Sequence, residues 1–206
     1  YEGLLALADE HNVAIAGGDF TVAEAPLSIT VSLTGTLSPK GTWLRSGAQP
    51  GDSLLVTGEL GGSILGHHMT FSPRLHEARR ISQDSVVHAA TDISDGLLRD
   101  LGHIAKASGL AAHLDLEAIP FSPAAVQLAR ESGLPPIQHA LTDGEDFELL
   151  LAIPADHADR LLSSQPLDCP LTCIGAFHAG QGVHTVDQKG TLLEVEPVGY
   201  QHGNPG

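Results

Sequence analysis

The sequence places aspartates where expected strands run into helices. The clearest case is Asp92-Ile-Ser-Asp95-Gly, which joins an expected strand, 88–91, to a helix beginning near Leu97. Main-chain N–H groups at a helix N-terminus favour anions such as phosphate. Asp92 and Asp95 could hold one Mg²⁺ across the turn while Ser94 hydrogen-bonds a phosphate oxygen. The alternative, that Ser94 or Asp95 is only the N-cap, accounts less well for Asp92, which precedes the cap.

Two shorter patterns could also serve a phosphate ligand. Gly17-Gly18-Asp19 follows an expected strand, and its glycines allow close approach of a ligand while Asp19 offers an oxygen to a cation. Taken alone, this triplet is explained better by a turn aspartate. Arg45 could pair with a nucleotide phosphate through its planar guanidinium, although a surface arginine beside a Pro-Gly turn is an equally good explanation.

An acidic run and a late aromatic residue complete the candidates. Asp143-Gly-Glu145-Asp146-Phe-Glu148 has four acids in six residues. If Phe147 faces the core, strand alternation puts Asp146 and Glu148 on the other face and Glu145 at the strand mouth, where a substrate can reach it. A polar strand edge that discourages aggregation is the alternative. Tyr200 could stack on a flat ligand, although most tail tyrosines do not.

The elements that position these residues follow from hydrophobic periodicity. Helices are expected over 1–11, 97–109, 123–131 and 155–162, with another opened by Gly58, Gly61 and Gly62. Strands are expected over 13–16, 27–37, 53–57, 88–91, 110–114, 146–153, 171–176, 182–186 and 191–195, with a turn at 187–190. Residues 38–50 are rich in Pro, Gly and Ser, which indicates a connection between domains. Interleaved helices and strands predict an α/β (α+β layered) fold.

Composition excludes several classes of protein. The formal net charge of −15 should repel nucleic acid and anionic membrane surfaces. No segment reaches the ~20 apolar residues of a membrane span. A content of 42% hydrophobic residues argues against disorder, and two cysteines exclude a disulfide framework. A cytoplasmic protein without nucleic-acid or membrane partners is therefore expected.

The order of the motifs is more specific than any one of them. Gly-Gly-Asp, Leu-Arg-Ser-Gly-Ala-x-Pro-Gly-Asp, Asp-Ile-Ser-Asp-Gly-Leu and Gly-Glu-Asp-Phe-Glu-Leu follow one another along the chain. In this order they resemble the thiamine-monophosphate kinase family, from about the first helix to Tyr200, and the stretch 92–109 is especially similar. The aminoimidazole ribonucleotide synthetase-like superfamily, with selenophosphate synthetase and a hydrogenase maturation protein, shares the architecture.

The resemblance implies a two-domain α/β chain that forms a homodimer through its N-terminal domain. Residues 1–40 correspond to the remainder of that domain, which binds metal and ATP, and residues 41–206 to the C-terminal α/β domain. The residues that match the family's motifs correspond to Mg²⁺ ligands (Asp19, Asp92 and Asp95), to ATP contacts (Gly18, Asp19, Arg45 and Ser94) and to thiamine phosphate contacts (Glu145 and Tyr200). One departure is Asp143, which stands where the family usually has glycine.

The activity implied by the resemblance is transfer of the γ-phosphoryl group of ATP to thiamine monophosphate, with several Mg²⁺ ions. No general base is assigned, because a phosphate acceptor is already deprotonated near neutral pH. The family's N-terminal segment, with further metal-binding aspartates, is absent from this sequence, so we expect the chain alone to be inactive. Two alternatives stay open: a related ATP-dependent enzyme acting on another substrate, and a nucleotide-binding scaffold without turnover.

Overall fold

The computed structural model describes residues 1–22, 24–38, 40–186 and 191–199. The chain divides into two compact units, residues 1–36 and 37–206, and each is described by itself. The domain boundary expected near residue 40 stays a prediction. No helix in the described part of the chain is long and apolar enough to cross a membrane.

The N-terminal unit holds one helix, α1 (Glu2–Glu10), which confirms the helix expected there. None of its residues is buried. The prediction of strands over 13–16 and 27–37 was wrong, because the described residues of this unit form no strand. The alternating segment 27–37 has no hydrogen-bonded partner strand among the described residues, and its apolar side chains stay exposed, Leu27 at 89% and Leu33 at 80%. Alternation shows which face a strand would bury but does not supply the neighbour that it needs.

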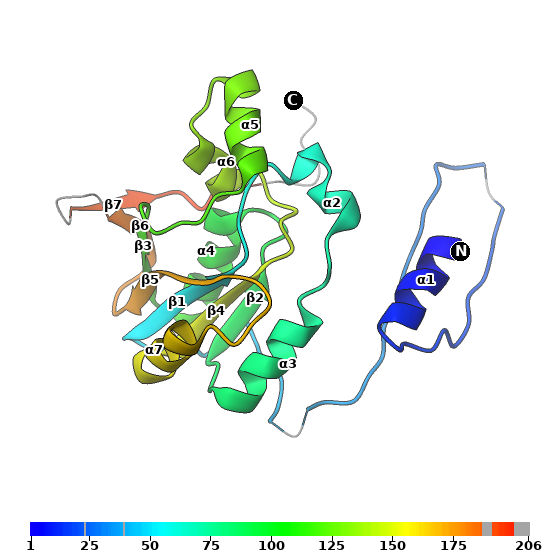
Figure 1. The fold of residues 1–206 in the computed structure, drawn as a ribbon, viewed down its shortest axis with the longest axis horizontal. Coiled ribbons are helices and arrows are strands. Elements are labelled where there is room, and N and C mark those ends of the chain that lie inside the picture. The colour runs from blue at the N-terminus through cyan, green and yellow to red at the C-terminus, as the bar shows by residue number, and fades with distance from the viewer. Residues whose placement is uncertain (23, 39, 187–190, 200–206) are drawn as a thin grey trace. The chain divides into compact units, whose positions relative to one another are not determined.

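The second unit is built on a seven-stranded sheet with the order β2-β4-β1-β5-β3-β6-β7 (Figure 1). All neighbouring strands are antiparallel except β3 and β6, which are parallel. The strands are β1 (Asp52–Thr57), β2 (Ala89–Asp92), β3 (Ala111–Asp115), β4 (Leu149–Pro154), β5 (Leu171–His178), β6 (Gly182–Val186) and β7 (Leu192–Val195).

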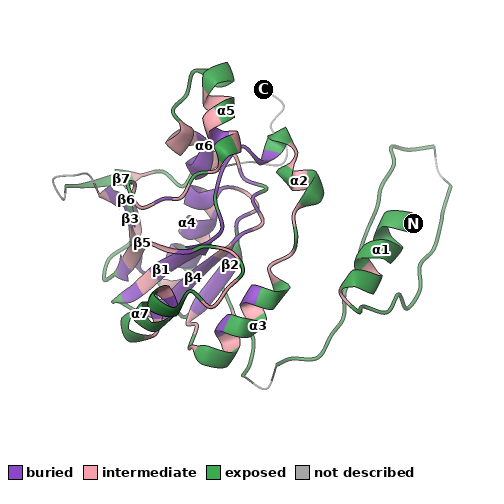
Figure 2. Ribbon diagram, viewed as in Figure 1, coloured by how far each residue is buried: buried purple, intermediate pink, exposed green. Residues whose placement is uncertain are grey.

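Helices cover both faces of this sheet, which confirms the α/β fold (Figures 1 and 2). The larger core includes residues of α4 and α6 on one face, and the smaller core includes residues of α3 and α7 on the other. The helices are α2 (His67–Thr70), α3 (Leu75–Asp84), α4 (Leu97–Ser108), α5 (Pro123–Ser132), α6 (Pro136–Thr142) and α7 (Ala155–Ser164), with a 3₁₀ turn at Ser63–Leu65.

Helix α4 forms where its apolar stripe predicted it. Leu97, Leu101 and Ile104 recur at helical spacing and are completely buried. Burial of each side chain contributes about 1.5–3 kcal/mol. The helix ends at Gly109, whose φ of 67° lies in the left-handed region that favours glycine. This packing fixes the N-terminal end of α4, where the Asp92–Gly96 turn lies.

Other elements differ from the expectation. Strand β4 begins at Leu149, not at residue 146, because Glu145 and Phe147 have positive φ values of 55° and 53° that are incompatible with a regular strand. The helix expected after Gly62 is a 3₁₀ turn followed by the four-residue α2. Helices α3 and α6 were not predicted.

Candidate active site

The turn between β2 and α4 ends at Gly96, the N-cap of the helix, which has a φ of 113° and no side chain that could cap the first turn. Neither Ser94 nor Asp95 is therefore the N-cap, and that alternative was wrong. Asp92 is exposed at the end of β2, whereas Ser94 and Asp95 are partly buried.

The side chain of Asp100 holds the backbone of this turn in place. Its side chain is buried, and Oδ2 accepts hydrogen bonds from the main-chain N–H groups of Ser94, at 3.0 Å, and Asp95, at 2.9 Å. Its other oxygen, Oδ1, is buried without a hydrogen-bond partner among the described residues. Burial raises the pKa of Asp100, and the nearby charges of Asp95 and Asp92 raise this pKa further. A cation beside these carboxylates would relieve their repulsion.

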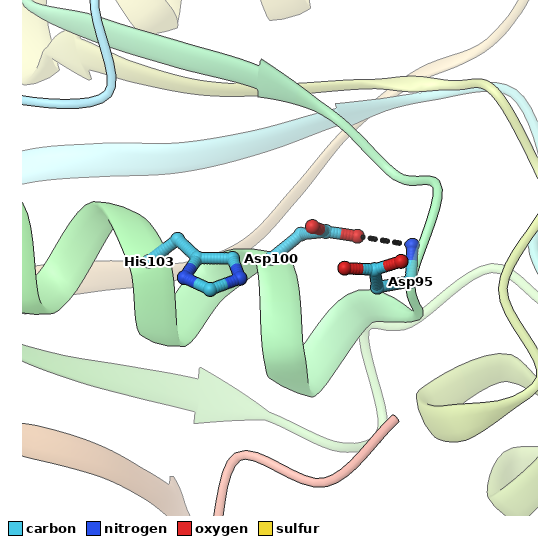
Figure 3. A group of neighbouring side chains, drawn as sticks. All are labelled: Asp95, Asp100 and His103. Atoms are coloured by element: carbon cyan, nitrogen blue, oxygen red, sulfur yellow. Dashed lines mark hydrogen bonds between the residues drawn. The ribbon is translucent and has the colours of Figure 1, made fainter. Parts of the chain in front are cut away.

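Asp95, Asp100 and His103 form a group that could hold a metal ion (Figure 3). One ligand atom from each lies within 4.8 Å of the others. The carboxylate oxygens suit Mg²⁺, whereas an imidazole is a ligand for transition metals. Sequence analysis missed Asp100 and His103. The available signal was that Asp100 falls three residues after Leu97, within the apolar stripe of α4.

The acidic loop before β4 is joined to this turn through the main chain. Glu145 N–H donates to the carbonyl oxygen of Ser94, and Phe147 N–H donates to that of Ile93, both at 2.9 Å. Gly144 packs so closely that a Cβ there would lie 2.6 Å from the Ser94 oxygen. Only glycine fits this contact. The side chain of Glu145 is exposed, so it is the acid of this loop that a substrate can reach.

The side chains of Asp146 and Glu148, two other acids of the loop, are bonded to groups inside the protein. The prediction that Asp146 and Glu148 lie on the face away from the core was wrong, because both are buried. Asp146 Oδ1 accepts the N–H of Gly61 at 2.9 Å, and burial raises the pKa of Asp146 to about 7. Arg74 forms a bidentate ion pair with Glu148, in which Nε lies 2.7 Å from Oε2 and Nη2 lies 2.6 Å from Oε1.

Asp143, the departure from the family pattern, is also paired. Its Oδ2 lies 2.9 Å from His139 Nδ1 on the same helical turn and 3.4 Å from the N–H of Gly62. The carboxylate that replaces the usual glycine is therefore held by α6 and the Gly62 loop.

The remaining predicted residues are spread over both units. Arg45 is exposed, and its Nε donates to the hydroxyl of Thr91, next to Asp92, at 3.2 Å. Gly18 and Asp19 are exposed residues of the N-terminal unit. Tyr200 lies outside the described residues.

The described end of the C-terminal tail contacts the first turns of α4. A Cβ at Gly102 would lie 2.6 Å from Pro197 Cβ, so a larger residue there would collide with the tail. A Cβ at Gly199 would collide with the main-chain oxygen of Asp95 and would lie 2.9 Å from Arg99 Cβ. The tail therefore reaches the turn that carries the predicted metal ligands.

Comparison with known sequences identifies the family. The profile for "AIR synthase related protein, C-terminal domain" matches residues 49–184. The thiamine-monophosphate kinase of Rhodopirellula baltica is 42% identical, over 98% of this chain and 63% of the relative. That of Salmonella typhimurium is 32% identical, over 98% of this chain and 67% of the relative. The chain belongs to the thiamine-monophosphate kinase family.

Solved structures of this family share the fold. The crystal structure of thiamine-monophosphate kinase from Stenotrophomonas maltophilia aligns with a TM-score of 0.69 and 32% identity, over 89% of this chain and 65% of that one. A structure of AaThiL complexed with AMPPCP and TMP aligns with a TM-score of 0.60 and 30% identity, over 77% and 53%. These kinases are longer than the present chain, which spans only part of them.

Proposed function

We propose that this chain is part of an enzyme that phosphorylates thiamine monophosphate with ATP and Mg²⁺, giving thiamine diphosphate and ADP. The observation that carries the proposal is the main-chain bond between Glu145 and Ser94, at 2.9 Å. It fixes the loop expected to contact thiamine phosphate beside the turn expected to contact metal and ATP. The simultaneous binding of AMPPCP and TMP by AaThiL supports the same pair of ligands.

The residues of the turn fit a hard cation. Asp92 and Asp95 would hold Mg²⁺, and Asp19, in the N-terminal unit, is a further candidate Mg²⁺ ligand by resemblance to the family motif. Asp100 supports this assignment, because its Oδ1 is buried without a hydrogen-bond partner among the described residues and its pKa is raised, first by burial and then by the charges of Asp95 and Asp92. Mg²⁺ bound there would neutralise charge on the two reacting phosphates and stabilise the transition state.

The chain's own groups would orient the two anions. Main-chain N–H groups at the N-terminus of α4, where the N-cap is Gly96, would bind a phosphate. Ser94 and Arg45 are proposed to contact ATP. Gly18 and Asp19, in the N-terminal unit, are further candidates by resemblance to the family motif. The exposed Glu145 is proposed to contact the cationic thiamine ring system, with Tyr200 as the aromatic partner.

No general base is required for this transfer. The acceptor oxygen of thiamine monophosphate is already deprotonated near neutral pH, so the remaining work is positioning. In-line alignment of the two phosphates would come from residues fixed at the turn and at the loop. The hydrogen bonds that Asp100 accepts from Ser94 and Asp95 would help to keep this alignment.

A substrate panel tests the proposal and separates it from its alternatives. The complete gene product, including whatever is encoded upstream of Tyr1, is incubated with ATP, Mg²⁺ and either thiamine monophosphate or another phosphate or carboxamide substrate. Thiamine diphosphate formed only from thiamine monophosphate supports the proposal. ADP release with a different acceptor would show a related enzyme, and ATP binding without any turnover would show a scaffold.

A further inference from the structure

A serine, a histidine and an aspartate form a chain of hydrogen bonds where α5 meets α6. Ser132 Oγ lies 2.8 Å from His139 Nε2. On the other side of the ring, His139 Nδ1 lies 2.9 Å from Asp143 Oδ2 and 3.1 Å from Asp143 Oδ1. A Ser-His-Asp triad has this connectivity, and such triads are recognised by geometry and not by their order in the sequence. None of the three residues is among those proposed to bind ATP, metal or thiamine phosphate.

The ends of the two helices place these side chains. Ser132 is the last residue of α5, which ends at Gly133 with a φ of 75°. His139 and Asp143 are four residues apart at the end of α6, so they lie on the same face of its last turn. His139 is buried, with 5% of the residue exposed, whereas Ser132 is exposed. The histidine is therefore held inside the protein, and the serine lies at the surface.

The loop at Gly61 and Gly62 holds the two helices, which lie side by side (Figure 1). A Cβ at Gly62 would lie 2.5 Å from the nitrogen of Ala125 in α5, and one at Gly61 would lie 2.6 Å from the nitrogen of Ala140 in α6. The N–H of Gly62 also donates to Asp143 Oδ2 at 3.4 Å. One segment of backbone therefore fixes both helices and the carboxylate.

The hydrogen bonds define where the protons lie. Because a carboxylate only accepts, Nδ1 of the neutral His139 ring carries the proton, and the lone pair of Nε2 faces Ser132. Ser132 Oγ accepts the N–H of Leu134 at 3.2 Å and donates its own hydrogen to Nε2. A second lone pair of Oγ is left for attack on an electrophile.

We propose that Ser132 is a nucleophile that accepts an acyl group from an activated ester, with His139 as its general base and Asp143 as the residue that orients the imidazole. Oγ forms a bond to the carbonyl carbon while its proton passes to His139 Nε2. The bond between that carbon and the leaving oxygen breaks, and the proton passes from Nε2 to the leaving oxygen. A water molecule that gives its proton to Nε2 then hydrolyses the acyl-serine, and Oγ takes the proton back.

The main-chain groups beside Ser132 set the class of substrate. The N–H of Gly133 donates to the carbonyl oxygen of Ala129 at 3.0 Å, and the N–H of Leu134 donates to Ser132 itself. Neither is free to stabilise an oxyanion, and loss of one such donor costs an enzyme about 10²–10³-fold in rate. The substrates are therefore esters with a leaving group that is stable as an anion, such as aryl esters, and not amides.

Reaction with p-nitrophenyl acetate, without ATP or Mg²⁺, tests this site on the complete gene product. Absorbance follows the release of p-nitrophenolate, and tandem mass spectrometry locates the acetyl group. We expect a burst of about one p-nitrophenolate per chain, with the acetyl group on Ser132. Ser132→Ala should abolish both signals, and His139→Gln should slow acetylation by at least about 10²-fold, the usual contribution of a general base.

Ser163→Ala is the matched control. Ser163 is also an exposed serine at the end of a helix, but its hydroxyl donates to the main-chain oxygen of Asp159 at 2.7 Å and not to a histidine. The control should react like wild type.

Three outcomes would overturn the proposal. These are no acetyl group on Ser132, acetylation of Ser132 no faster than that of Ser163, and equal rates for wild type and a folded His139→Gln. Circular dichroism checks the fold of each variant. If His139→Gln does not fold, Asp143→Asn takes its place and should also slow the reaction, because an amide no longer fixes the tautomer of the ring. The assay needs neither ATP nor Mg²⁺, so its failure is distinct from failure of the proposed kinase function.

Discussion

The buried carboxylate of Asp100 accepts the main-chain N–H of Asp95 at 2.9 Å, which binds the helix to the turn that precedes it. The same oxygen accepts the N–H of Ser94 at 3.0 Å. One side chain thus fixes the backbone of two residues that are proposed to contact metal and ATP. Asp100 itself need not touch a substrate to matter for catalysis.

Replacing Asp100 tests this positioning role. Asp100→Ala leaves two partly buried N–H donors without an acceptor, so we expect the free energy of unfolding to fall by about 1–3 kcal/mol. Asp100→Asn keeps an acceptor oxygen and removes a charge whose burial is unfavourable, so it should retain most of the stability. Urea unfolding of both variants measures the difference. Equal stability of Asp100→Ala and wild type would show that these hydrogen bonds do not hold the turn.

Asp92 should affect activity much more than stability. Its side chain is exposed at the end of β2, so Asp92→Asn should change the free energy of unfolding by less than about 0.5 kcal/mol. Loss of a charged metal ligand should lower kcat by about 10²-fold or more. Kinase assays over a range of Mg²⁺ concentrations check this, with the exposed Asp156→Asn of α7 as a matched control. Full activity of Asp92→Asn at limiting Mg²⁺ would show that Asp92 is not a ligand of the metal.

Asp146 should make stability depend on pH. Burial raises its pKa from 3.8 to about 7, so the folded state binds a proton that the unfolded state releases. Its contribution is fully present below pH 3.8 and is lost as the pH rises through about 7. Asp146→Asn cannot ionise, so its stability relative to wild type should increase between about pH 5 and about pH 8. Urea unfolding at both pH values measures this, and a constant difference would contradict the raised pKa.

The ion pair between Arg74 and Glu148 should be costly to break from one side. Glu148 is buried, with 3% of its side chain exposed, whereas Arg74 keeps 20% exposed. Arg74→Met leaves a buried carboxylate without its partner and should cost about 3 kcal/mol, the lower end for such pairs. The double variant Arg74→Met/Glu148→Gln removes both charges and should recover part of that loss. If Arg74→Met has the same free energy of unfolding as wild type in urea, the ion pair contributes nothing to stability.

The helix that positions the site could be predicted from its sequence, but the joining of the motifs could not. Leu97, Leu101 and Ile104 specify α4 because helical periodicity is local, and burial of all three confirms it. The contact between Glu145 and Ser94 joins segments far apart in the chain, and no local pattern encodes it. Asp100 was overlooked because a polar residue in a helix is normally solvated, and only the packed structure shows it buried.

The wrong predictions have a common cause. Alternation over 27–37 describes a possible face, but a strand also needs a neighbour to accept its hydrogen bonds. The alternation of Asp146 and Glu148 assumed a regular strand, whereas positive φ at Glu145 and Phe147 breaks it. Both errors arise where tertiary contacts, not local preference, set the backbone.

The most direct test of the proposed activity follows the phosphoryl group itself. The complete gene product is given ATP labelled in the γ-phosphate, Mg²⁺ and thiamine monophosphate, and the label in thiamine diphosphate is compared with the ADP formed. We predict equal amounts of labelled thiamine diphosphate and ADP, and loss of both in Asp92→Asn. ADP without labelled thiamine diphosphate, or no turnover by a folded protein that binds ATP, would contradict the account.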